Sequence, residues 1–135
     1  MGEPRVWSIA RLADGDCRDA AVDVNGFGLN CTIPIDDEPE PAGATPFGLL
    51  AASLSACTVM SARTFLQRWQ VTPGEVSVRV AIRPAGAAPV LERHVTVAGA
   101  VEPDLRRQLM AELDATPVTR LLRDSIPIRT VLTTS

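Results

Sequence analysis

The chain has 135 residues, of which 46% are hydrophobic and 21% are charged, and its formal net charge is −3. These values are ordinary for a soluble globular protein, and the length predicts a single domain over residues 1–135. The negative charge and the lack of a basic stripe exclude a protein that binds nucleic acid through its phosphates. The chain contains no lysine, which also excludes Schiff-base chemistry on a lysine side chain.

The three cysteines, Cys17, Cys31 and Cys57, lie far apart in the sequence. An odd number of cysteines without CxxC spacing predicts neither a disulfide framework nor a metal site, and we expect no metal and no cofactor. Residues 1–12 contain no apolar stretch of the kind that a secretory signal needs, so we expect a protein of the reducing cytoplasm.

The first third of the chain predicts three strands. Residues 5–13 alternate weakly between apolar and polar side chains and form the first. Residues 20–24 and 27–33 flank Asn25-Gly26, a dipeptide that strongly favours a two-residue hairpin turn.

A long central helix is predicted over about residues 46–69. Thr45 is a good N-cap, and Pro46 suits the first helical position because its missing N–H has no partner there. From residue 47 to 62 nearly every side chain is apolar or small on all sides of the helix. Such a helix is either buried or spans a membrane, and its small polar residues and the arginines that follow argue against the membrane. Because so small a chain cannot easily cover this helix, we predict a homodimer in which a second copy covers it.

The rest of the chain completes an α+β fold. The elements predicted from apolar alternation and from proline-initiated helices are a strand at 76–82, a loop at 84–89, a strand at 91–98, a helix from Pro103, a short helix from Pro117 and a strand at 126–132. The predicted order is β-β-β-α-β-β-α-α-β, with the long buried helix at its centre.

Cys57 lies in the middle of the central helix and is the best candidate for a reactive group. A cysteine reacts as its thiolate, which a nearby cation stabilises. The neighbours that share its helix face are uncharged: Leu50, Ser53, Leu54, Met60, Ser61 and Thr64. These neighbours alone favour an inert core cysteine, whereas a reactive thiol requires an arginine brought in from elsewhere in the fold.

Two segments of the chain resemble a known family. The segments PFGLLAASLSACTVMSARTFLQR (residues 46–68) and ATPVTRLLRDSIPIRTVL (residues 115–132) are similar to parts of the OsmC/Ohr family, the osmotically inducible protein C and organic hydroperoxide resistance proteins. The order of the predicted elements agrees with that family. The resemblance implies an OsmC-like fold, an intertwined homodimer with active sites at the subunit interface.

The resemblance also implies the roles of individual residues. The family's peroxidatic cysteine falls on Cys57, which would attack the O–O bond of an organic hydroperoxide and become a sulfenic acid. Its activating arginine falls on Arg18. Its resolving cysteine falls on Thr116, and the glutamate that orients the arginine falls on Gly48. The two-cysteine cycle therefore cannot run as in the family, and activity is expected to be weak or lost.

An oxidised Cys57 could be reduced by two other routes. Cys17 precedes Arg18 and could act as a relocated resolving thiol, the alternative being an exposed loop cysteine. An external thiol or dithiol reductant could instead resolve the sulfenic acid directly.

Two functions remain open. The first is thiol-dependent reduction of organic hydroperoxides at Cys57, favoured by the presence of Cys57 and Arg18. The second is a non-catalytic family member that binds a small apolar ligand or senses oxidants at the dimer interface, favoured by Gly48 and Thr116. The apolar residues expected to line the binding site are Phe47, Leu50, Leu54 and Met60.

Overall fold

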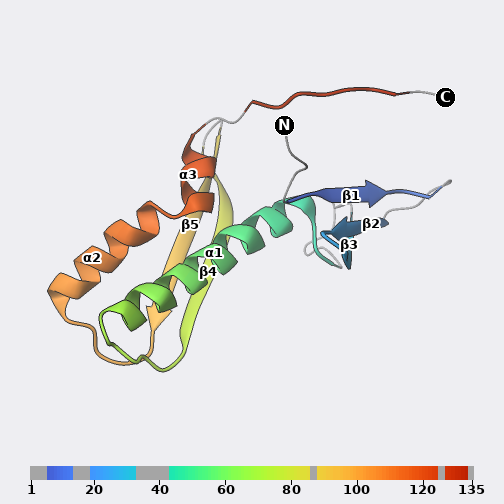
Figure 1. The fold of residues 1–135 in the computed structure, drawn as a ribbon. Helices are drawn as coiled ribbons and strands as arrows, with labels where there is room; N and C mark the ends of the chain where they lie inside the picture. Colours follow the sequence, from blue (N-terminus) through green and yellow to red (C-terminus); the bar gives the residue numbers. More distant parts are fainter. Residues whose placement is uncertain (1–5, 14–18, 33–42, 86–87, 125–126, 134–135) are drawn as a thin grey trace, which may run out of the picture. The chain divides into compact units, whose positions relative to one another are not determined.

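The computed structural model describes residues 6–13, 19–32, 43–85, 88–124 and 127–133 (Figure 1). The chain divides into two compact units, Met1–Leu50 and Ala51–Ser135. The division falls within the long helix α1 (Pro46–Arg68), which contributes its first turn to the first unit.

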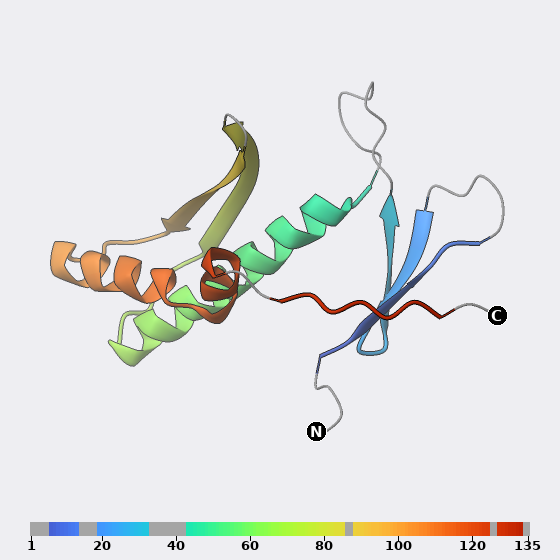
Figure 2. The same cartoon turned by 90° about the horizontal axis from the view of Figure 1, so that it is seen from above.

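The first unit contains a three-stranded antiparallel sheet in the order β1-β2-β3 (Figure 2). Its strands are β1 (Ser8–Arg11), β2 (Asp19–Val24) and β3 (Phe27–Thr32). Asn25 and Gly26 have φ values of 49° and 95°, as a type I′ turn requires. The Gly26 N–H donates to Asp23 Oδ1 at 2.7 Å, and the predicted hairpin is confirmed.

Helix α1 begins where the sequence predicts. The Thr45 hydroxyl oxygen accepts a hydrogen bond from the Gly48 N–H at 3.0 Å, which satisfies one of the free N–H groups of the first turn. The Leu49 N–H then makes the first intrahelical bond, to the Thr45 carbonyl at 2.8 Å.

The second unit packs helices against a β-hairpin. The hairpin consists of β4 (Val76–Ala85) and β5 (Ala88–Val97), and it is followed by α2 (Pro103–Asp114) and α3 (Pro117–Arg123). The core of the unit is formed by Ala62, Phe65, Leu66, Leu109 and Leu113. Val76, Val95 and Val97, which share one face of the hairpin, pack against this core, so α1 and α2 cover the same face (Figures 1 and 2).

Two predicted elements are wrong. The predicted loop at 84–89 is largely strand, with Pro84 opposite Pro89 in the ladder. Proline is tolerated there because each strand of a two-stranded sheet has a free edge that needs no N–H donor. The predicted strand at 126–132 is absent from its described part, since residues 127–133 have no regular secondary structure and pair with no described strand.

Helix α1 is buried on one side only. Its buried residues are Leu54, Thr58, Ala62, Phe65 and Leu66. On the remaining surface, Phe47 is 66% exposed and Met60 is 69% exposed. By length and composition α1 could cross a membrane, with 28% of its apolar window buried, a property that core helices of soluble proteins share. The prediction of a helix covered on all sides is therefore not met within one chain.

Candidate functional site around Arg93 and Cys57

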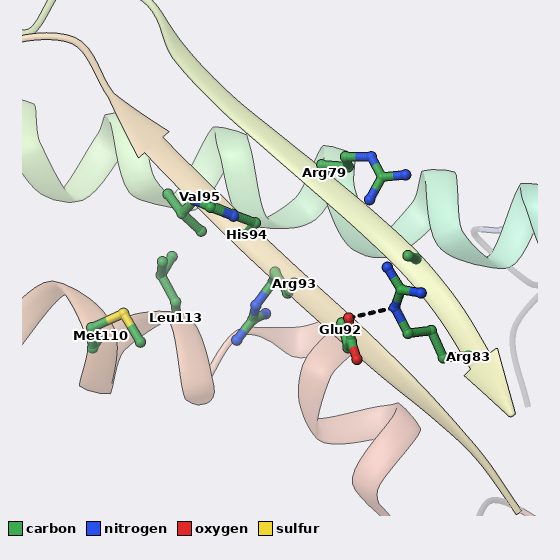
Figure 3. Close-up of a pocket in the computed structure, with 9 residues that line it drawn as sticks. Arg79, Arg83, Glu92, Arg93, His94, Val95, Met110 and Leu113 are labelled. Atoms are coloured by element: carbon green, nitrogen blue, oxygen red, sulfur yellow. Dashed lines mark hydrogen bonds and ion pairs between the residues drawn. The ribbon is translucent and has the colours of Figure 1, made fainter. Parts of the chain in front are cut away.

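A largely buried arginine lies beside the core of the second unit. Arg93 shares a face of β5 with Val95, which packs against the core, and its side chain is only 15% exposed. Figure 3 shows Arg93 extending from β5 toward the end of α2. Its Nη1 donates to Thr58 Oγ1 at 3.1 Å and to Thr119 Oγ1 at 2.9 Å. Arg93 therefore joins the middle of α1 to the start of α3.

Three buried threonines surround this arginine. Thr58, Thr116 and Thr119 are 0%, 4% and 6% exposed. The Thr58 hydroxyl donates to the Leu54 carbonyl at 2.7 Å, and the Thr116 and Thr119 hydroxyl oxygens are 2.7 Å apart. Thr116 Oγ1 also donates to the Leu113 carbonyl at 3.2 Å instead of capping α3. All three hydroxyls are thus satisfied within a closed hydrogen-bond network.

Asp114 is the carboxylate of this network. Its Oδ1 accepts from Arg93 Nη2 and from Arg123 Nη2, both at 3.3 Å. Its side chain is 51% exposed, and that of Arg123 is 60% exposed. Two guanidinium groups therefore share one partly solvated carboxylate, and the three side chains together carry a net positive charge.

Cys57 precedes Thr58 on α1, but its side chain does not point in the same direction as that of Thr58. Successive residues of a helix differ by about 100° in direction, so the Cys57 side chain lies on the flank of the buried face. It is a free thiol of intermediate exposure. Among the described residues, no N–H or O–H group donates a hydrogen bond to its sulfur. The thiol is therefore not sealed in the core, and no polar side chain from the described part of the protein holds it.

The structure describes only part of the predicted site. Arg18 and Cys17 lie outside the described residues, so their roles remain predictions. Of the predicted apolar lining, Leu54 is buried and Leu50 is half-buried, whereas Phe47 and Met60 are exposed. Cys31, on β3, is buried.

Two pockets adjoin Arg93. One, of about 480 Å³, runs along β5, with Arg79, Arg83 and His94 from the hairpin and Met110 from α2 in its wall (Figure 3). The other, of about 370 Å³, is lined by Leu54, Leu91, Arg93, Met110, Asp114, Thr119, Leu122 and Arg123. Leu54 precedes Cys57 by three residues, which makes them neighbours on the same side of α1. The second pocket therefore lies on the side of α1 that carries the candidate thiol, although Cys57 itself is not among its lining residues.

Arg93 belongs to this candidate site although the sequence pattern did not predict it. Leu91, Val95 and Val97 have the same strand phase as Arg93, so the arginine occupies a position where the pattern predicts an apolar side chain. A charged residue in phase with the core positions of a strand is the signal that could have identified it. Among the described residues, no group of three His, Cys, Asp or Glu side chains could hold a metal ion.

Comparison with known proteins extends these observations. The family model for OsmC-like protein matches residues 36–131. The fold is similar to that of an OsmC like protein from Mycoplasma pneumoniae, with a TM-score of 0.69, 15% identity and coverage of 90% of this chain and 89% of that chain. It is also similar to an organic hydroperoxide resistance protein from Elizabethkingia anophelis, with a TM-score of 0.67, 18% identity and 90% of each chain covered.

A third solved structure gives the same result. The organic hydroperoxide resistance protein OhrB of Bacillus subtilis matches with a TM-score of 0.56 and 15% identity over 87% of this chain and 90% of that chain. At these identities the structural matches establish the fold. No curated protein matches the chain in sequence.

Proposed function

Because the chain belongs to the OsmC-like protein family, we propose that it is a thiol-dependent hydroperoxide reductase that uses one cysteine per chain, Cys57. The contrast between Cys57 and Thr116 carries this proposal. Cys57 is a free and partly accessible thiol, whereas Thr116, at the family's second cysteine position, is a buried hydroxyl within a closed network. A hydroxyl forms no disulfide, so the chain retains the means for the first half of the family's cycle but not for the second.

The proposed reaction begins at the Cys57 thiolate. Its sulfur attacks one oxygen of the hydroperoxide, the O–O bond breaks, and the departing alkoxide takes up a proton to become the alcohol. The sulfur is oxidised to a sulfenic acid. One external thiol then forms a mixed disulfide with Cys57 and releases water. A second thiol displaces Cys57 as its thiolate and leaves as a disulfide with the first.

The proposal includes a homodimer located in the reducing cytoplasm. The exposed apolar side chains of α1, including Phe47 and Met60, support a partner that covers this helix. Arg18 is proposed as the cation that activates the thiolate, as the family resemblance implies. A reducing compartment would supply the external thiol that a one-cysteine cycle requires.

A second candidate function is a non-catalytic family member that binds a small apolar ligand or senses oxidants through Cys57. Gly48 and Thr116 favour it, because both stand where the family has groups that support turnover. In this case Cys57 would be oxidised once and not be recycled.

Peroxide turnover separates the two candidates. Consumption of tert-butyl hydroperoxide would be measured with dithiothreitol as reductant for the wild type, Cys57→Ser and Cys17→Ser. The proposal expects turnover that is abolished in Cys57→Ser and unchanged in Cys17→Ser. Equal, slow consumption by the wild type and Cys57→Ser would rule out catalysis at Cys57. Loss of turnover in Cys17→Ser would instead make Cys17 the resolving thiol.

A further inference from the structure

The pocket of about 370 Å³ is lined by Leu54, about one helical turn from Cys57, and its lining indicates which kind of reductant could reach the oxidised thiol. We propose that this pocket binds the external thiol, and that the preferred thiol is a small molecule that carries a carboxylate. The inference rests on the proposed function, because only an oxidised Cys57 needs such a partner.

The position of the pocket supports a role in reduction of Cys57. Leu54 lines the pocket and is the neighbour of Cys57 on the same side of α1, with about 5–6 Å expected between their Cβ atoms. The other apolar lining residues are Leu91, Met110 and Leu122. Its volume lies at the lower end of the range for small-molecule sites, so it suits a compact ligand.

The charges of the pocket favour an anion. Its charged lining groups are Arg93, Arg123 and Asp114, and the single carboxylate is shared by both guanidinium groups at 3.3 Å. Arg93 also donates two hydrogen bonds to the neutral hydroxyls of Thr58 and Thr119. A guanidinium has five N–H donors, so both arginines keep free donors for a ligand carboxylate.

The arginines differ in a way that suits binding and release. Arg93 is 15% exposed and held by three partners, so it provides a fixed charge at the inner end of the pocket. Arg123 is 60% exposed and lies on the short helix α3, where it can turn from Asp114 toward an incoming carboxylate. A carboxylate held there leaves the rest of a small thiol free to extend past Leu54 toward Cys57.

Reduction of Cys57 at this site takes two reactions, a condensation with the sulfenic acid and then a thiol–disulfide exchange. The sulfur of the bound thiol attacks the Cys57 sulfenic sulfur, the S–O bond breaks, and the oxygen leaves as water with the thiol proton. A second molecule of the same thiol attacks the mixed disulfide and restores Cys57 as its thiolate. The two electrons come from the two thiol molecules, which leave joined as a disulfide.

The test separates oxidation of Cys57 from its reduction. The full chain is treated with one equivalent of tert-butyl hydroperoxide, and the Cys57 sulfenic acid is quantified by dimedone trapping and mass spectrometry. Decay of the sulfenic acid is then timed with 3-mercaptopropionate, which is anionic, and with 2-mercaptoethanol, which is neutral. Because each variant is compared with the wild type for the same thiol, the intrinsic reactivities of the two thiols cancel.

Arg123→Gln is expected to slow reduction by 3-mercaptopropionate about three- to tenfold and to leave reduction by 2-mercaptoethanol unchanged. Arg93→Gln provides a second variant with the same expected selectivity. Arg79→Gln is the matched control, because Arg79 is exposed, alternates with the strand positions that face the core and does not line the pocket of about 370 Å³. It removes the same charge and should change neither rate.

Equal slowing with both thiols, no slowing with either, or the same slowing in Arg79→Gln would overturn the inference and leave the proposed function intact. Slower formation of the sulfenic acid in Arg123→Gln, without slower decay in 3-mercaptopropionate, would also overturn it. If no sulfenic acid forms at Cys57 in the wild type, the proposed function itself fails and the inference fails with it.

Discussion

Arg93 combines a permanent charge with a side chain that is largely removed from solvent. A buried charge is tolerated only when hydrogen bonds replace its hydration, and three are present here, to Thr58, Thr119 and Asp114. Since the same Nη1 atom contacts Thr58 Oγ1 and Thr119 Oγ1 at 3.1 and 2.9 Å, the two hydroxyl oxygens are at most about 6 Å apart. Arg93 thus determines the spacing between α1 and α3 beside Cys57.

We expect Arg93→Ala to lower the free energy of unfolding by about 1–3 kcal/mol, because three hydrogen bonds and the packing of the arginine stem are lost. Arg83→Ala is the control. Arg83 pairs with Glu92 at 2.7 Å, but both side chains are more than half exposed, so its loss should cost less than about 1 kcal/mol. Urea denaturation followed by circular dichroism measures both values. Equal losses in the two variants would contradict the structural role of Arg93.

Thr116→Cys tests whether this residue alone interrupts the family's two-cysteine cycle. The substitution preserves the side-chain size but loses the hydroxyl bonds to Leu113 and Thr119, at an expected cost of about 1 kcal/mol. After stoichiometric hydroperoxide, we expect an intramolecular disulfide between residues 57 and 116, detected by mass spectrometry of non-reduced peptides.

Thr116→Ser is the control for that experiment, since it keeps the hydroxyl and adds no thiol. A sulfenic acid at Cys57 that persists in Thr116→Cys would show that the distance or geometry between the two positions, and not the missing thiol, prevents closure.

At the level of secondary structure, the features that the sequence predicted correctly are those that local interactions determine. The Asn25-Gly26 turn, the Thr45 cap of α1 and the prolines that open α2 and α3 are each specified within four residues, and all are present. The predictions that failed concern elements that depend on residues distant in the sequence. The segment at 127–133 has strand-like composition, but a strand forms only beside a partner. The same limit applies to Arg93, whose hydroxyl partners come from elements far from β5 in sequence.

Gly48 is a weak point in α1. It occupies the third helical position, where glycine costs about 0.5–1 kcal/mol relative to alanine, and the first turn carries no acidic residue. A Cβ atom there would lie 3.2 Å from Thr45 Oγ1, so the hydroxyl must shift by a few tenths of an ångström. We expect Gly48→Ala to raise the free energy of unfolding by about 0.5 kcal/mol.

Gly48→Glu should add a further few tenths of a kcal/mol, because the carboxylate interacts with the helix dipole and can complete a capping box with Thr45. Thermal denaturation of both variants separates helix propensity from the carboxylate effect. If Gly48→Ala destabilises the protein, the contact with Thr45 outweighs helix propensity. If Gly48→Glu also raises peroxide turnover and Gly48→Ala does not, the carboxylate acts on the site as well.

At the level of the whole molecule, one chain leaves too much apolar surface in water. Met60 is 69% exposed on α1, and Ile128, Val131 and Leu132 are 86–90% exposed in the C-terminal segment. Large exposed apolar areas mark interaction surfaces, and a segment without a paired strand can obtain one from another molecule. The apolar composition of α1 predicted this need from the sequence, but the contacts that would satisfy it would have to come from a second chain.

We therefore expect a homodimer of about 29 kDa, twice the chain mass of 14.4 kDa, in size-exclusion chromatography with light scattering. Met60→Glu should shift the mass toward the monomer at micromolar concentration, since a buried unpaired carboxylate at an interface costs several kcal/mol. Leu121→Glu, at a 53% exposed position on α3, serves as the control with the same added charge. Dissociation by Leu121→Glu and not by Met60→Glu would place the interface on α3, and a monomeric wild type would refute the homodimer.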